Sequence, residues 1–156
     1  MSKRKENVIN HTNAVASDRK KWIRRNKYYY QNLTNLLKFS IPEGSSIIEI
    51  GCGIGNQLND LKPSRGVGID ISENMIVEAK KEFPQYEFIV MDSEEINISE
   101  KFDFVIISDT IGYFNDVQKS LEQIRNLCSE NTRIIVTYVN FLWLPILDLA
   151  ELLRVK

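Results

Sequence analysis

The sequence has few residues that could hold a metal ion or form a disulfide. It contains two cysteines and one histidine in 156 residues. Cys52 and Cys128 lie far apart without the spacing of a metal site, and His11 alone is too little for a histidine-based one. We therefore expect no metal site, reduced thiols in a cytoplasmic protein, and a surface position in a mobile tail for His11.

Long apolar runs are also missing. No run approaches the roughly 18 residues that a membrane helix needs. The first residues, MSKRKENVINHTN, lack the apolar segment of a secretory signal. We therefore expect no membrane span. The remaining composition, 43% apolar and 26% charged, fits one globular domain with a hydrophobic core.

Positive charge is concentrated at the start of the chain. Residues 1–30 contain nine Lys or Arg and two acids, whereas the rest contains eleven bases and nineteen acids. A basic arm can attract nucleic acid, although it is more often a solvated leader or one face of a helix. We expect a basic, flexible leader over residues 1–20 and one domain over residues 21–156. RNA binding by the arm remains the alternative.

Apolar segments of strand type alternate along the chain with segments of helical periodicity. The predicted strands cover residues 47–50, 66–70, 86–92, 102–109 and 132–140. The predicted helices cover residues 18–39, 57–61, 72–83, 115–128 and 145–155, with Ser72 and either Asn115 or Asp116 as caps. Continuously apolar strands are typical of a sheet covered on both faces. The pattern predicts an α/β fold with a doubly wound parallel sheet.

A glycine-rich turn follows the first predicted strand. In SIIEIGCGIGNQL, Gly51, Gly53 and Gly55 occupy alternate positions. In an open parallel sheet, ligands bind at the carboxyl ends of the strands. A dinucleotide fingerprint would need glycine at Asn56, and Glu49 beside the turn would repel a pyrophosphate and attract an ammonium group. An oxidoreductase with a nucleotide cofactor is therefore the less favoured interpretation.

Four segments together resemble one enzyme family. IIEIGCGIGNQL resembles the first motif of the class I S-adenosylmethionine-dependent methyltransferases, and GVGIDIS, FIVMDSEEI and FDFVIISDTIGYF resemble the next three. The resemblance covers roughly residues 20–140 and implies S-adenosylmethionine as cofactor. It also implies a Rossmann-like sheet of about five strands in the order 3-2-1-4-5. The final antiparallel strands of the full fold would be missing, so we expect a chain truncated at its C-terminal end.

The resemblance also implies roles for individual residues. Asp70 would hold the ribose hydroxyls, Asp92 and the Ser93 amide would meet adenine, and Glu49 would bind the amino end of the cofactor. From the residues alone, Asp70 and Asp92 could each be helix caps instead. Cys52 is interpreted as a small turn residue, and core packing is the alternative for Met75. The full expected cofactor set is Tyr29, Glu49, Gly51, Cys52, Gly53, Gly55, Asp70, Ile71, Met75, Asp92, Ser93 and Ser108.

The catalytic residues are not determined by the sequence. Asp109 and Tyr113, after the fourth strand, are candidates for a base, which is needed only if the acceptor must lose a proton. The stretch SDTIGYF is not an N-P-P-Y-type tetrad, and no paired cysteines suggest attack on a pyrimidine. A small-molecule or glycan-type acceptor is therefore favoured over nucleic acid. Residues 36–70 and 108–128 further resemble methyltransferase domains of type 11/12 that adjoin glycosyltransferase domains.

Three further expectations concern the ends of the chain. The segment FLWLPILDLAELLRV is strongly apolar, and strand five would lie at the edge of the sheet. We therefore expect a homodimer through the C-terminal helix or that edge. The helix around residues 22–37 is expected to close over the cofactor, with residues 28–30 near its methionine end. A cofactor-binding fragment without activity of its own remains an alternative to an enzyme.

Overall fold

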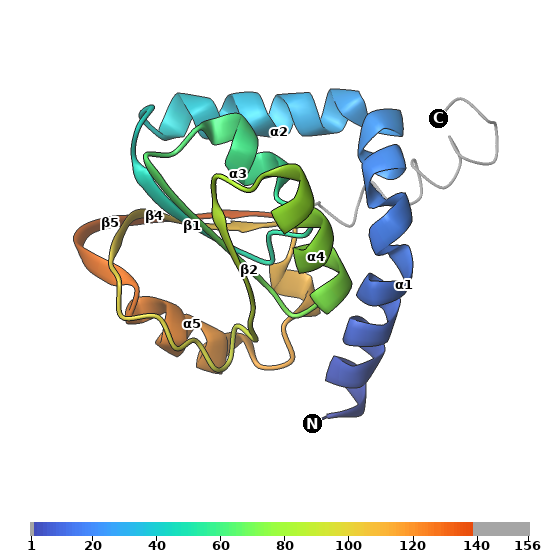
Figure 1. Ribbon diagram of the computed structural model, residues 1–156. Coiled ribbons are helices and arrows are strands. Elements are labelled where there is room, and N and C mark those ends of the chain that lie inside the picture. Colours follow the sequence, from blue (N-terminus) through green and yellow to red (C-terminus); the bar gives the residue numbers. More distant parts are fainter. Residues whose placement is uncertain (1, 139–156) are drawn as a thin grey trace.

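The computed structural model describes residues 2–138 of the chain, which form one sheet flanked by helices (Figure 1). All strand pairs are parallel, and the order is β3-β2-β1-β4-β5. The strands are β1 (Ser46–Ile50), β2 (Arg65–Asp70), β3 (Glu87–Val90), β4 (Phe102–Ser108) and β5 (Cys128–Thr137). The predicted Rossmann-like fold and strand order are confirmed. Strand order reverses beside β1, which pairs with both β2 and β4.

The helices cover both faces of this sheet, and the first of them lies across the carboxyl ends of its strands. They are α1 (Lys3–Arg25), α2 (Lys27–Ser40), α3 (Asn56–Leu61), α4 (Glu73–Glu82) and α5 (Val117–Arg125), with a 3₁₀ turn, η1 (Ile111–Tyr113). The side chain of Ser72 caps α4 by accepting from the Met75 amide, and Asp116 caps α5 by accepting from the Lys119 amide. Both caps were predicted, and both lie where the chain turns from the sheet into a helix.

The N-terminal segment differs from the prediction. Residues 3–20, predicted to be a flexible leader, belong to α1, and the single helix predicted over residues 18–39 is divided at Asn26. The first 41 residues contain no Gly or Pro, and the Ser2 hydroxyl accepts from the Lys5 amide at the start of α1. The buried Ala16 then packs α1 against Ile54 and Met75. The prediction of a flexible leader was based on the basic character of these residues. Their helix propensity and the contact of Ala16 with the domain are sufficient to order them as a helix.

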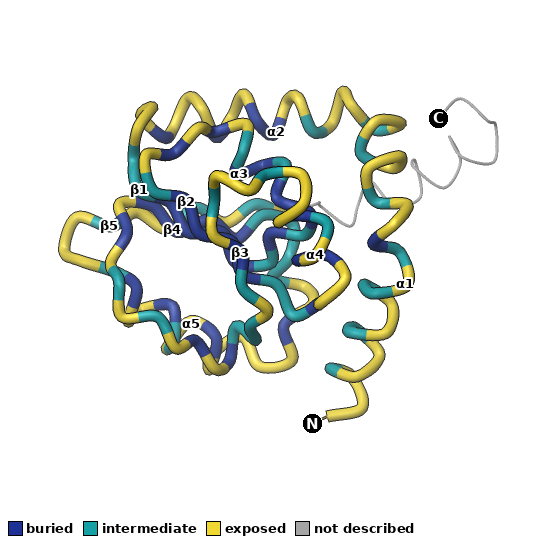
Figure 2. Tube along the Cα trace, viewed as in Figure 1, coloured by how far each residue is buried: buried dark blue, intermediate teal, exposed yellow. Residues whose placement is uncertain are grey.

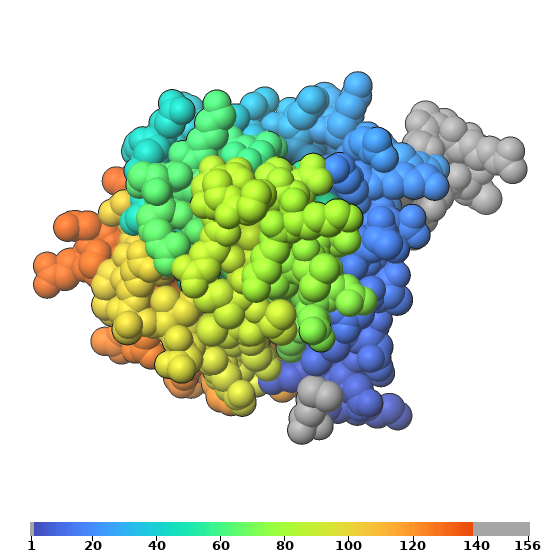
Figure 3. Space-filling model, viewed as in Figure 1, coloured from blue at the N-terminus to red at the C-terminus, as the bar shows by residue number. Residues whose placement is uncertain are grey.

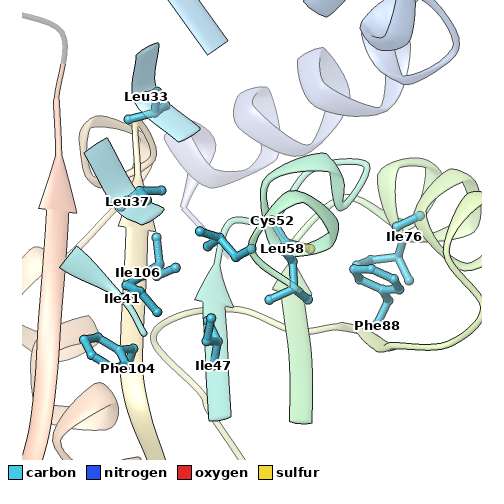
Figure 4. Packing of buried hydrophobic residues seen from close by; sticks show 12 residues of the cluster. Leu33, Leu37, Ile41, Ile47, Cys52, Leu58, Ile76, Phe88, Phe104 and Ile106 are labelled. Carbon is cyan, nitrogen blue, oxygen red and sulfur yellow. The ribbon is translucent and has the colours of Figure 1, made fainter. Parts of the chain in front are cut away.

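Two apolar clusters fill the space between the sheet and its helices. On one face, Leu37 of α2, Leu58 of α3 and Ile76 of α4 pack against the sheet at Ile47 and Ile106 (Figure 4). On the other face the cluster joins α5 to the sheet, through Ile48, Ile50, Val67, Ile69, Val105, Ile107 and Ile124. Figure 2 shows the buried strands between more exposed helices. This rigid centre fixes the carboxyl ends of the strands.

The outer side of β5 remains partly open. Among the described residues β5 is an edge strand, as predicted, and Ile134 and Val136 are 45% and 46% exposed. The helix predicted over residues 145–155 lies outside the described residues, and a homodimer through that helix or the β5 edge stays a prediction. Within residues 2–138, no helix is long and apolar enough to cross a membrane.

Candidate functional site

A cavity of about 200 Å³ lies at the carboxyl ends of the strands, where strand order reverses. Its walls come from the turn after β1 and from the segments that follow β2, β3 and β4. Helix α1 closes the remaining side, and Figure 3 shows this helix (blue) alongside α4 (green). Parallel sheets bind ligands at this position. The cavity is therefore the candidate site.

The glycine turn is shaped by two kinds of constraint. A Cβ at Gly51 would lie 2.1 Å from Thr110 Cγ2, and one at Gly55 would lie 2.6 Å from the Phe88 ring, so both glycines serve packing. A Cβ at Gly53 would meet nothing within 4 Å, and this residue lines the cavity with a φ of 53°. Only Gly53 therefore leaves open space toward a ligand. Gly55, expected in the cofactor set, does not line the cavity.

Asp70 is fixed at the end of β2 by the turn itself. Its Oδ2 accepts from the Gly53 amide and its Oδ1 from the Ser72 amide, both at 2.9 Å. Burial raises the pKa of Asp70 above its ordinary value, although these amides act in the opposite direction. Asp70 lines the cavity, and Ser72 rather than Asp70 caps α4. Remaining lone pairs on the carboxylate are available to hydroxyl groups of a ligand.

Glu49 is the most unusual acid of the site. It is only 3% exposed, and among the described residues nothing donates a hydrogen bond to its Oε2. Burial, followed by the charge of Asp70, raises the pKa of Glu49 to about 8. Glu49 lines the cavity, and a buried carboxyl oxygen without a partner is costly unless a ligand supplies one. The site thus presents an acceptor suited to an ammonium group.

Asp92, after β3, forms an ion pair that sequence analysis missed. Its Oδ2 lies 2.5 Å from Lys5 Nζ on α1, and its Oδ1 accepts from the Glu94 amide at 2.9 Å. Lys5 also pairs with the buried Glu94 at 2.9 Å. The Ser93 hydroxyl shares a 2.9 Å hydrogen bond with Ser120. The sequence shows Lys5 as one of a run of basic residues, but it does not show that Asp92 and Glu94, far along the chain, are its partners.

The end of β4 brings the candidate base into the cavity. Asp109 has a φ of 53°, and its amide donates to the Thr137 carbonyl at 3.1 Å. The Tyr29 hydroxyl donates to Asp109 Oδ2. Burial, and then the Asp109 carboxylate, raise the pKa of Tyr29 above its ordinary value, so this phenol is held in its donor form. Ser108 and Tyr113 line the same end.

One face of α1 forms the wall opposite the strand ends. Lys5, Val8, His11, Thr12, Val15, Arg19 and Ile23 line the cavity from this helix. His11, predicted in a mobile tail, is therefore part of the wall. The helical cover expected at residues 22–37 is formed mainly by α1. From that range Ile23 and Tyr30 line the cavity, whereas Tyr29 reaches it only through Asp109.

Most of the predicted cofactor residues meet in this one cavity. These are Glu49, Gly51, Cys52, Gly53, Asp70, Ile71, Met75, Asp92, Ser93 and Ser108. Met75 lines the cavity and also packs in the cluster with Ala16 and Ile54, so its position is compatible with both interpretations. Burial raises the pKa of Cys52 well above its ordinary value, which fits a turn residue and not a nucleophile. Sequence analysis missed the polar lining residues Asn56, Gln57 and Thr110.

The charges of the lining favour a cationic ligand. The carboxylates of Asp70, Asp92, Glu94 and Asp109 face two cations, Lys5 and Arg19, and Lys5 is already paired. Glu49, with a pKa of about 8, adds a negative charge once it releases its proton. Within the described range, no cluster of His, Cys, Asp and Glu could hold a metal ion. An excess of carboxylates suits an ammonium- or sulfonium-bearing nucleoside and opposes a pyrophosphate.

The sheet order, the glycine turn and the acid at the end of β2 define a Rossmann-like domain with a candidate nucleoside site at its strand ends. The family model of the methyltransferase domain matches residues 41–154, and the chain belongs to this family. The family resemblance of the four sequence motifs is thereby confirmed.

Three similar proteins illustrate the range of the family. A malonyl-[acyl-carrier protein] O-methyltransferase of Magnetococcus marinus is 31% identical over 62% of this chain and 38% of its own length. A dTDP-3-amino-3,4,6-trideoxy-alpha-D-glucopyranose N,N-dimethyltransferase of Streptomyces venezuelae is 25% identical over 56% of this chain and 38% of its own length. The crystal structure of the PH0226 protein from Pyrococcus horikoshii aligns with a TM-score of 0.70 and 26% identity, over 79% of this chain and 63% of that one. The chain thus spans less than two thirds of each of these proteins.

Proposed function

We propose that this protein binds S-adenosylmethionine and transfers its methyl group to a small-molecule or glycan-type acceptor. The observation that carries the proposal is Glu49 Oε2, a buried carboxyl oxygen without a partner among the described residues, beside a glycine turn. The cofactor bears an α-ammonium group that would supply the missing hydrogen bonds. Its sulfonium methyl is already electrophilic, so the protein's main task is to position an acceptor in line with it.

The residues present fit the parts of this cofactor in order along the cavity. Asp70 would accept from the ribose hydroxyls, and Asp92 with the Ser93 amide would meet the adenine ring. Glu49 would take the ammonium group. Arg19 is the lining cation without a carboxylate partner among the described ion pairs, and it would take the cofactor carboxylate. Lys5 lies near the adenine end and Arg19 near Tyr30, to whose hydroxyl it donates at 3.2 Å.

Helix α1 has to shift when the cofactor enters. The cavity of about 200 Å³ is smaller than the roughly 300–1,000 Å³ typical of ligand pockets. Lys5 already occupies the Asp92 oxygen that the adenine amino group would use. We therefore infer that Lys5 gives up its contact with Asp92 and keeps the one that it already makes with Glu94. Asp92 would then be free for the adenine amino group while a salt bridge still holds α1.

The similar proteins support methyl transfer and leave the acceptor open. By name, one methylates an acid on a carrier protein and another an amino sugar. Because the cofactor would fill this cavity, only a small reacting group could enter beside it, and a small acceptor meets that limit better than a folded nucleic acid. This supports the small-molecule or glycan-type class over RNA.

Isothermal titration tests the binding step. S-adenosylmethionine should bind with a dissociation constant in the micromolar range, about −7 to −9 kcal/mol. Asp70→Ala should weaken binding by on the order of 1–3 kcal/mol, because ribose hydroxyls would lose a shielded acceptor. Asp60→Ala, which removes an exposed carboxylate of α3, is the control and should leave affinity unchanged. Equal affinity for NAD and S-adenosylmethionine would rule the proposal out.

A further inference from the structure

The cavity end beside β4 contains a carboxylate whose position is held by several contacts. Asp109 adopts a left-handed backbone, with a φ of 53°, immediately after the strand. Its amide bonds the Thr137 carbonyl of β5, and Thr137 Oγ1 lies 3.4 Å from its Oδ1. Strained backbone of this kind persists where the surroundings over-determine it and is concentrated at functional sites. The Asp109 side chain lines the cavity.

Tyrosines surround this carboxylate. Tyr29 donates its hydroxyl to Asp109 Oδ2, and its ring makes an edge contact with Tyr30 at 5.3 Å between centroids. Tyr30 and Tyr113 line the cavity with Asp109. Burial raises the pKa of Tyr30, the Arg19 charge lowers it and the Asp109 charge raises it, which agrees with the proximity of Tyr30 to both charged groups. Aromatic rings next to a carboxylate form an environment that can favour cations.

We propose that the methyl acceptor of this protein is an amine, bound as a cation by Asp109 and the tyrosines around it. This inference rests on the proposed function and narrows its substrate class. Asp109 would orient the nitrogen through one carboxylate oxygen while Tyr29 holds the other. A charge-assisted hydrogen bond of this kind fixes direction better than a neutral one.

The reaction balances without any further reagent. The bound ammonium first loses one proton, through the Asp109 carboxylate, to solvent. The nitrogen lone pair then forms the new N–C bond as the C–S bond breaks, and that electron pair stays on sulfur, giving a thioether. The methylated product is again an ammonium ion. Asp109 therefore faces a cation before and after transfer.

Other acceptors fit this end of the cavity less well. A carboxylate acceptor would approach Asp109 with like charge, which costs free energy. A hydroxyl acceptor holds its proton far more tightly than an ammonium ion does, so Asp109 is a much weaker base toward it.

The test uses matched acceptors and two variants of the full chain. Glucosamine, glucose and glucuronic acid, together with cyclohexylamine, cyclohexanol and cyclohexanecarboxylate, are incubated with protein and methyl-labelled S-adenosylmethionine. Mass spectrometry records the labelled products. Ligand-detected NMR ranks binding of the same six compounds to protein loaded with S-adenosylhomocysteine. Titration of S-adenosylmethionine on each sample reports the cofactor step separately.

Amines should bind most tightly and carry the label. Asp109→Asn keeps the size and tolerates a left-handed backbone. It should raise KM for the amine roughly 10- to 100-fold, since a charged partner is lost, with cofactor affinity changed less than about twofold. Tyr29→Phe should give a smaller loss in the same direction. Asp60→Asn, on the exposed side of α3, is the matched control and should match the parent protein.

Two sets of results overturn the inference. Label found only on the hydroxyl or acid compounds, or binding of amines no tighter than of their hydroxyl counterparts, would show that Asp109 does not select a cation. Unchanged KM in Asp109→Asn would show the same. In each case, retained binding of S-adenosylmethionine leaves the proposed function intact. Loss of cofactor binding in the parent protein would instead refute the proposed function itself.

Discussion

Lys5 Nζ lies 2.5 Å from Asp92 Oδ2, so the start of the first helix is joined to the segment after the third strand. The same ammonium group reaches Glu94, and all three side chains are largely shielded from water. This pair attaches α1 across the cavity at one end. The contact of Ala16 with Met75 attaches it further along.

Replacing Lys5 should therefore destabilise the fold measurably. Lys5→Met should lower the free energy of unfolding by about 1.5–3 kcal/mol, because Glu94 would keep a buried charge without its strongest partner. Lys20→Met is the matched control, since its 2.7 Å pair with Glu82 is about half exposed. That change should cost less than about 1 kcal/mol. Urea unfolding of both variants measures the difference, and equal losses would contradict the role of Lys5.

The fold and much of the site follow from local signals, whereas the α1 wall does not. Apolar strands and the caps Ser72 and Asp116 are encoded within a few residues, so they could be predicted. Asp70 and Asp92 were predicted because each ends a strand. Lys5 and Asp92 are brought together only by tertiary packing, and a charge pattern cannot show it. The packing of Gly55 against Phe88 could not be predicted either, because these residues are likewise distant in sequence.

The two glycines at the start of the turn should respond differently to alanine. Gly51→Ala should lower stability by roughly 2–4 kcal/mol, since the new methyl would overlap Thr110 and the residue has a φ of 76°. Gly53→Ala should cost only about 1–2 kcal/mol of stability, the strain of its backbone. It should nevertheless weaken cofactor binding, because its methyl would occupy open space in the cavity. Thermal unfolding and titration of both variants test this; similar stability losses would count against it.

The stability of the cofactor-free protein should depend on Glu49 and pH. Its pKa is raised from 4.5 to about 8 on folding. Its contribution is therefore complete below about pH 4.5 and is lost as pH rises through about 8. Relative to Glu49→Gln, the parent protein should lose up to about 1.4 kcal/mol of unfolding free energy per pH unit between about pH 5 and 8. Urea unfolding across this range measures it, and parallel curves for both proteins would refute it.

Cofactor affinity should pass through a maximum near the pKa of Glu49. Below about pH 8 the carboxyl is protonated and must release its proton to bind an ammonium group. Above that pH an α-amino group, with an ordinary pKa of about 7.7–8.0, loses its own charge. Affinity for S-adenosylmethionine should therefore rise from about pH 6 and fall again above about pH 8. Titrations at pH 7 in two buffers of different ionisation enthalpy should show proton release, and none in Glu49→Gln.

Cofactor binding should also slow hydrogen exchange in α1. The helix is held by a small apolar cluster and a few ion pairs, whereas the strands are buried between two layers. Segments with few buried contacts open at lower cost than the core. Without ligand, amides of α1 should therefore exchange faster than those of β1 and β4, and S-adenosylmethionine should protect them together with the segment at Asp92. Helix α5, whose residues do not line the cavity, is the internal control. Exchange of α1 that stays fast at saturating cofactor would show that this helix does not close the site.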